Sequence, residues 1–172
     1  MALQLFKIAS TTVETPVTSV SFSSIPQGYT DLKLVGSVRG SRSSAYVINL
    51  SLTFNSSTTS YSDVFMYDNS GTVSTGKDTN YSSYAYIYGT ADNATTNAFS
   101  SFEVYIPNYT SSNYKSFSSD TVMESNTSSF TLPTLLGAGL WSNTSAISSL
   151  SIGLNNGTSI NANSTLTLYG VL

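Results

Sequence analysis

The sequence predicts an all-β fold, an antiparallel β-sandwich of the jelly-roll-like kind with about eight to ten strands. Apolar and polar residues alternate with period two along many short segments, which is typical of strands that turn one face to a core. Ser, Thr, Asn and Gly separate these segments, as turns require. Ala, Glu, Lys and Leu are too sparse to favour helices, and no stretch carries a good apolar stripe of helical period.

Four strands are predicted in the N-terminal third of the chain. Short apolar segments at Leu3–Ile8 and Val17–Phe22 predict the first two. Asp31–Arg39 predicts the third, because apolar residues or Gly fill every second position. Tyr46–Phe54 predicts the fourth most clearly, with an apolar residue at each alternate position from end to end.

The middle of the chain is less regular. Asn55–Ser83 is rich in Ser, Thr, Asp and Gly, and it predicts a long connection with one short strand around Val64–Tyr67. The next strand is predicted at Ser83–Tyr88, where tyrosines alternate with Ala and Ile.

Five further strands are predicted in the C-terminal part. Alternation predicts three of them directly, and apolar content predicts the other two. In chain order these strands are Phe102–Ile106, Lys115–Met123, Leu135–Trp141, Ser149–Leu154 and Thr165–Leu172.

The composition limits the function as well as the fold. The 172 residues show no linker or shift of composition, so we expect one β-sandwich domain over 1–172. Ser, Thr and Asn supply 72 residues, charged residues are only 9%, and the net charge is -3. With no Cys and no His, the chain lacks thiol nucleophiles, Cys/His zinc sites and Ser-His catalysis. Six basic residues make nucleic-acid binding unfavourable. We therefore predict no enzyme activity, cofactor or metal, and neither a nucleic-acid nor a membrane partner.

Two groups of residues are candidates for contacts with a partner. Tyr84, Tyr86 and Tyr88 fall on alternate positions, which predicts three rings on one strand face. Such rings suit an interface or a carbohydrate platform, or they pack in the core with their hydroxyls at the rim. Arg39 and Arg42 flank a predicted Gly-Ser turn, where they either contact a partner or remain solvated. We expect Trp141 in the core.

Acidic residues raise two alternatives. Glu103 and Asp120 are candidates for a carboxylate pair of a glycan hydrolase, against the simpler interpretation as solubilising surface charges. Four residues of the irregular middle segment carry oxygens that suit Ca²⁺, although turn formation explains the same residue types. These four are Asp63, Asp68, Asn69 and Asp78.

Four segments resemble a family of virion proteins. TSVSFSSIPQGYTDLKLVGSVR (Thr18–Arg39) carries a phrase F-x-x-I-P-x-x-Y-x-D-L followed by Arg. The segments VINLSLTFN (Val47–Asn55), IPNYTSSNYKSF (Ile106–Phe117) and STLTLYGVL (Ser164–Leu172) add to the likeness. Together they resemble small β-rich virion proteins of tailed bacteriophages, cyanophages among them.

The resemblance implies a structural role on a phage particle. We expect a capsid decoration (cement) protein that binds the major capsid protein in the virion and forms a homo-oligomer, a trimer being favoured. The predicted strands leave no separate anchoring segment, which favours this role over a fibre. The alternative is a tail or fibre adhesin that stacks host-surface carbohydrate on its tyrosines. No catalytic residue or cofactor comes with the family.

Overall fold

The computed structural model describes residues 4–69, 71–124 and 134–172. Strands make up 58% of the chain, and the antiparallel sheets pack as a sandwich consistent with the jelly-roll-like fold. The predicted fold class is therefore confirmed. The described residues contain no helix, and hence none long and apolar enough to cross a membrane.

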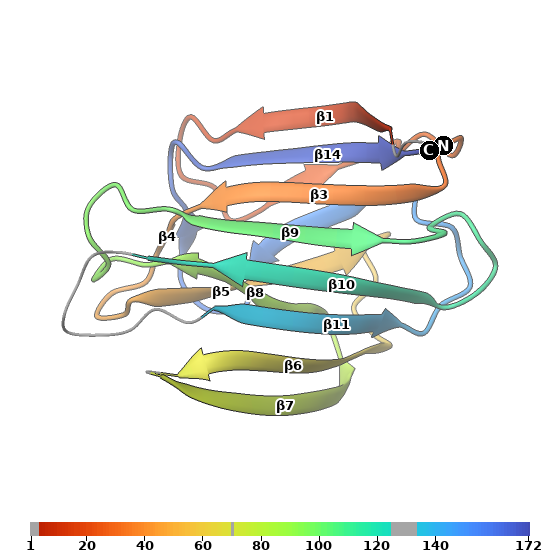
Figure 1. Cartoon of the computed structure of the whole chain (residues 1–172). Helices are drawn as coiled ribbons and strands as arrows, with labels where there is room; N and C mark the ends of the chain where they lie inside the picture. The colour runs from red at the N-terminus through yellow and green to blue at the C-terminus, as the bar shows by residue number, and fades with distance from the viewer. Residues whose placement is uncertain (1–3, 70, 125–133) are drawn as a thin grey trace.

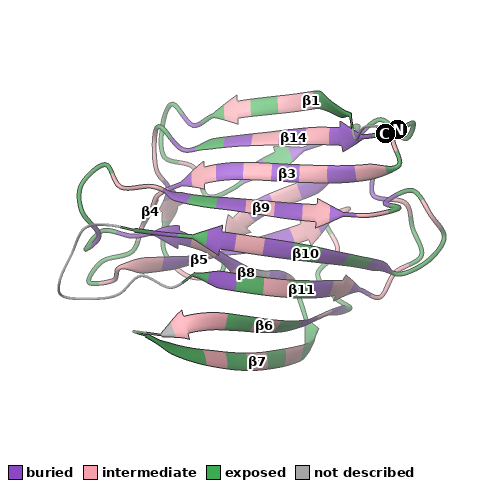
Figure 2. Cartoon of the chain, in the orientation of Figure 1, coloured by how far each residue is buried: buried purple, intermediate pink, exposed green. Residues whose placement is uncertain are grey.

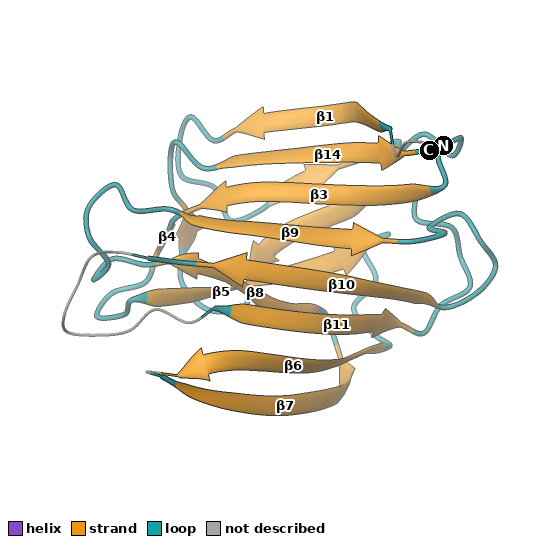
Figure 3. Ribbon diagram, viewed as in Figure 1, coloured by secondary structure: helices purple, strands orange, loops and turns teal. Residues whose placement is uncertain are grey.

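The strands form two main sheets that pack face to face (Figures 1 and 3). Across the larger sheet lie β1 (Leu5–Thr12), β14 (Thr165–Val171), β3 (Asp31–Val38), β9 (Ser100–Ile106), β10 (Lys115–Val122), β11 (Leu135–Trp141), β6 (Tyr61–Asn69) and β7 (Thr72–Tyr81). Across the smaller sheet lie β2 (Val20–Phe22), β12 (Leu150–Leu154), β5 (Val47–Phe54) and β8 (Tyr84–Thr90). A separate short pair consists of β4 (Gly40–Ser41) and β13 (Ser159–Ile160).

The core lies between the two main sheets, and the period-two alternation decides which side chains enter it. In β3, Leu32, Leu34, Gly36 and Val38 are buried, whereas the residues that alternate with them are partly buried. Figure 2 shows the same alternation of buried and partly buried positions along β3 and β9. Burial of each such side chain stabilises the fold by about 1.5–3 kcal/mol. The apolar faces of the strands therefore hold the two sheets together.

One end of the core is built from aromatic rings. The Trp141 ring lies 5.6 Å from that of Phe54 and stacks on Tyr61 at 6.3 Å between centroids. Phe117 meets Phe54 edge-on at 5.3 Å. The backbone N–H of Phe54 donates to the Tyr61 hydroxyl at 2.7 Å, so the buried hydroxyl is satisfied. The predicted core position of Trp141 is confirmed.

Every strand predicted by alternation or apolar content is present, but the described part of the chain forms fourteen strands rather than eight to ten. The additional ones include the two-residue strands β4 and β13, which are too short to show a pattern. The first predicted strand runs later than expected, over Leu5–Thr12, and its predicted start at Leu3 lies outside the described residues.

The prediction of a long connection over residues 55–83 is wrong. This segment forms two of the longest strands, β6 and β7, which pair as a hairpin at the edge of the large sheet. The predicted strand at Val64–Tyr67 is only the middle of β6. Neither strand alternates clearly, because β6 has apolar residues on both faces and β7 is an exposed, mostly polar edge strand.

The predicted turn between Arg39 and Arg42 is also wrong. Gly40 and Ser41 form β4 and pair with β13, and the chain turns afterwards, at Ser43–Ser44. A Cβ at Gly40 would lie 2.8 Å from the carbonyl oxygen of Ser159. Glycine is therefore needed here for close strand pairing and not for a turn.

Candidate functional site

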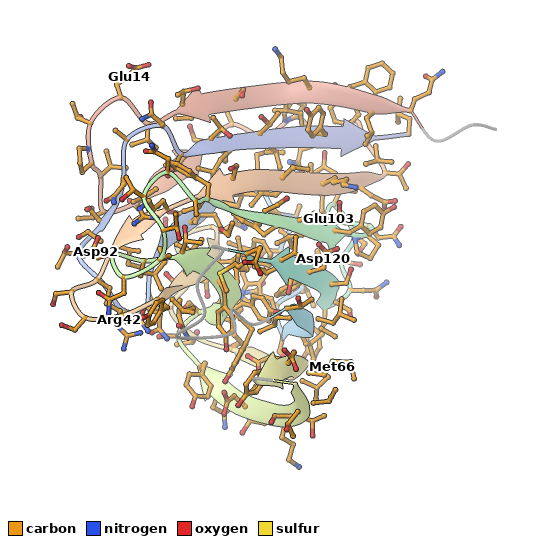
Figure 4. The ribbon with its side chains drawn as sticks, turned by 60° about the vertical axis from the view of Figure 1, so that its left-hand side comes forward. Glu14, Arg42, Met66, Asp92, Glu103 and Asp120 are labelled. Carbon is orange, nitrogen blue, oxygen red and sulfur yellow. The ribbon has the colours of Figure 1, made fainter. Side chains whose placement is uncertain are left out.

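The outer face of the large sheet carries exposed apolar side chains where β11 meets β6. Val64 is 56% exposed, Met66 43% and Leu136 54%. In the β11–β6 register Leu136 lies opposite Met66, and Ala138 lies opposite Val64. These four residues are therefore contiguous, and we name them the apolar patch. Figure 4 places Met66 on this part of the sheet, apart from the labelled acidic residues.

A groove of about 670 Å³ runs along the apolar patch. Its far side is formed by Thr75, Gly76 and Lys77 of β7. Val73, which is 67% exposed, lies on the same face because it pairs with Asp68 of β6. A contiguous exposed apolar surface is typical of a protein–protein contact site.

Sequence reasoning missed the apolar patch. The signal that could have found it is the loss of alternation in Val64–Met66 and in Leu135–Leu136, where consecutive residues are apolar. In a strand with one face in a core, consecutive apolar residues must place one of them outside.

The structure gives the predicted arginines different roles. The Arg39 guanidinium donates to the carbonyl oxygens of Asp92, Ala94, Thr95 and Ala98 at 3.0–3.4 Å. It therefore holds the loop between β8 and β9. Arg42 is exposed and donates one hydrogen bond, of 3.0 Å, to the carbonyl oxygen of Val47. Of the two, Arg42 has the freer guanidinium.

The three predicted tyrosines do not share one face of β8. Leu50 pairs with Ile87 and Leu52 with Tyr84, so β8 holds one more residue than β5 at this point. This β-bulge turns both Tyr84 and Ile87 into the core, where each is 0% exposed. The Tyr84 hydroxyl lies 2.5 Å from Ser119 Oγ of β10. Tyr84 is therefore part of the inter-sheet core and presents no ring to a ligand.

Tyr86 and Tyr88 lie on the other face of β8, against the β6–β7 hairpin. The Tyr86 ring stacks on Phe65 at 3.6 Å between centroids, and Phe65 contacts Tyr67. Burial raises the pKa of Tyr88, with a smaller effect of Tyr67. These rings form a second, smaller aromatic layer, which explains why the hairpin stays attached beyond the edge of the smaller sheet.

Two of the four predicted calcium ligands meet beside this layer. Asp63 and Asp78 are directly opposite in the β6–β7 register, whereas Asp68 lies near the other end of the hairpin. The Tyr86 hydroxyl donates to the Asp78 carboxylate. Asp63 is buried, and burial together with the charge of Asp78 raises its pKa to about 6. Of the Asn69 side chain the structure describes nothing.

The structure also brings Glu103 and Asp120 together, as a cross-strand pair of β9 and β10 (Figure 4). Both lie on the outer face, side by side rather than facing each other. Lys33 forms an ion pair with Glu103 at 2.7 Å. Burial and the Glu103 charge raise the pKa of Asp120, and Lys33 lowers it. A hydrolase needs carboxyl groups on opposite sides of the scissile bond, so this arrangement fits surface charges better.

The chain was compared with protein-family models and with curated proteins, and nothing matches it in either comparison.

Proposed function

We propose that this chain is a virion structural protein of a tailed bacteriophage, a capsid decoration protein that binds the coat lattice through the apolar patch. The observation that carries the proposal is that Val64, Met66 and Leu136 are about half exposed and contiguous on the outer face of the large sheet. The phage-like phrases of the sequence support the same role.

The surface chemistry suits a lattice partner. The apolar patch itself contains no charged side chain, so its contacts depend little on salt. A shell presents many copies of one site, and weak apolar contacts gain strength when several linked copies bind together. We propose that the chain acts as a homotrimer for this reason, with a mass of about 55 kDa, three times that of the 18.3 kDa chain.

The alternative, a carbohydrate-binding adhesin, was expected to bind sugar on the rings of Tyr84, Tyr86 and Tyr88, and the structure does not present these three rings together. The Tyr84 ring is in the core, and the Tyr86 ring is stacked on Phe65 with its hydroxyl bonded to Asp78. A flat row of three accessible rings is therefore not present on β8, and no other observation favours sugar binding.

The proposal is tested by co-sedimentation of the purified chain with shells of the major capsid protein of the phage that encodes it. Leu136→Ser removes the centre of the apolar patch, and we expect binding to fall at least tenfold. Leu5→Ser is the matched control, because Leu5 is 49% exposed but lies on β1 at the opposite edge of the sheet. Equal loss in both variants, or no binding of the unaltered chain, contradicts the proposal.

A further inference from the structure

A small pocket lies between the β6–β7 hairpin and the outer face of the smaller sheet. Its volume is about 130 Å³, enough for one ion and two or three waters. Every lining residue carries a side-chain oxygen, and none carries a positive charge: Asn49, Asp63, Asp78, Tyr81, Ser83, Tyr86 and Asn155.

Asp63, which lines this pocket, has one carboxylate oxygen without a partner among the described residues. Asp63 is only 6% exposed, and its Oδ1 atom has no hydrogen bond within the described part of the chain. A buried polar atom without a partner costs about 1–3 kcal/mol, and a charged one costs more. Asp78 stands directly opposite: its backbone N–H donates a hydrogen bond to the Asp63 carboxylate, but its own carboxylate adds repulsion.

The groups around Asp78 are hydroxyls that donate hydrogen bonds to it. Tyr86 donates a hydrogen bond from its hydroxyl to the Asp78 carboxylate, and the Tyr81 hydroxyl also bonds to that carboxylate. The Lys77 side chain lies on the opposite face of β7 from the pocket, because Lys77 pairs with the outward-facing Val64. No basic side chain therefore lines the pocket to neutralise the two carboxylates.

We propose that this pocket binds one Ca²⁺ ion, with Asp63 and Asp78 as its carboxylate ligands. Hard divalent cations take oxygen ligands, and Ca²⁺ accepts six to eight of them in flexible geometry, including amides, hydroxyls and water. The amide side chains of Asn49 and Asn155 lie at the pocket wall, and Asn49 is fixed by a 3.1 Å hydrogen bond from Asn156 Nδ2. The described residues contain no cluster of three acidic side chains, so the neutral oxygens and water must complete the shell.

The cation would hold the hairpin to the sandwich. Asp63 and Asp78 belong to β6 and β7, whereas Asn49 belongs to β5 of the other sheet. An ion shared among them links the strands that carry the apolar patch to the main core. This inference concerns the fold of the chain and stands or falls independently of the virion role.

The test is thermal unfolding of the full chain, freed of divalent ions by chelation and then titrated with CaCl₂. At a free Ca²⁺ concentration about 100 times Kd, we expect the Tm to rise by about 5–10 °C. NaCl at matched ionic strength is the control for screening. Tb³⁺ serves as an independent probe, because Tyr81 and Tyr86 at the pocket wall should sensitise its luminescence.

Asp63→Asn keeps the shape of the side chain and removes one ligand charge, so the Ca²⁺-dependent rise in Tm should disappear. Asp120→Asn is the matched control: Asp120 is also a cross-strand partner of an acidic residue, but it lies on the outer face. It should keep the full response. No Ca²⁺ effect in the unaltered chain, or an equal effect in Asp63→Asn, overturns the proposal. Asp78→Asn gives a second variant with the same expectation if Asp63→Asn does not fold.

Discussion

Removing the buried charge of Asp63 should stabilise the chain when divalent ions are absent. In the folded chain the pKa of Asp63 is raised from 3.8 to about 6, first by burial and then by Asp78. The folded state therefore binds more protons than the unfolded state between pH 4 and 6. Stability is lost as the pH rises through this window, because the carboxylate must then be ionised inside the protein.

The magnitude follows from the pKa shift. Two pKa units correspond to about 3 kcal/mol at pH 8, where Asp63 is ionised in both states. The variant Asp63→Asn does not titrate, so it should exceed the unaltered chain in free energy of unfolding by up to about 3 kcal/mol at pH 8. At pH 4.5 the difference should fall to about 1 kcal/mol, because most of the folded chain then carries a proton on Asp63.

The assay is urea-induced unfolding in the presence of a chelator, measured at several pH values from 4.5 to 8. Equal m-values for the two proteins show that both unfold from equally compact states. A variant that is less stable at pH 8, or an advantage that does not shrink toward low pH, refutes the reasoning that Asp63 is a destabilising buried charge.

Three further predictions concern the fold. Arg39→Ala removes the donor that holds four carbonyl oxygens of the β8–β9 loop. The free energy of unfolding should fall by about 2 kcal/mol, and amide exchange across residues 92–98 should become faster. Unchanged exchange there contradicts this role. Tyr84→Phe keeps the ring and loses the Ser119 bond, so urea unfolding should show a loss of about 1 kcal/mol, and a neutral result argues against that bond. Gly139→Ala places a methyl group against the Phe117 ring, and should lower the free energy of unfolding by about 1–3 kcal/mol; an unchanged Tm contradicts the close packing.

The sequence predicts strands well where one face is buried and the other contacts solvent. β3 and β5 have this environment, and their alternation is strict. β6 and β7 do not, because β6 faces aromatic rings on one side and leaves the apolar patch exposed on the other. A strand with two apolar faces, or with none, loses the period that identifies it.

The candidate site was less predictable than the fold, because it depends on register. The bulge in β8 adds one residue between Tyr84 and Ile87 relative to β5, so Tyr84 and Tyr86 fall on different faces, and no local sequence pattern indicates this. The meeting of Asp63 with Asp78 depends on the pairing of the hairpin, since fifteen positions separate them in the sequence. The sequence named Asp63, Asp68, Asn69 and Asp78 as possible Ca²⁺ ligands, but it could not show that the register joins Asp63 to Asp78 and leaves Asp68 near the other end of the hairpin.

The exposed apolar patch also depends on tertiary structure. Leu136 and Met66 become neighbours only through the β11–β6 pairing, which joins segments far apart in the chain. Either residue alone would be an ordinary exposed hydrophobic side chain. Together with Val64 they form the surface on which the proposed lattice contact depends.

Cryo-electron microscopy of the phage particle that carries this chain tests the central proposal most directly. We predict density for the two-sheet sandwich at symmetry-related positions of the capsid, in groups of three, with β11 and β6 turned toward the coat protein. Density for the sandwich on the tail alone, or on the capsid with β11 and β6 facing solvent, would contradict the account.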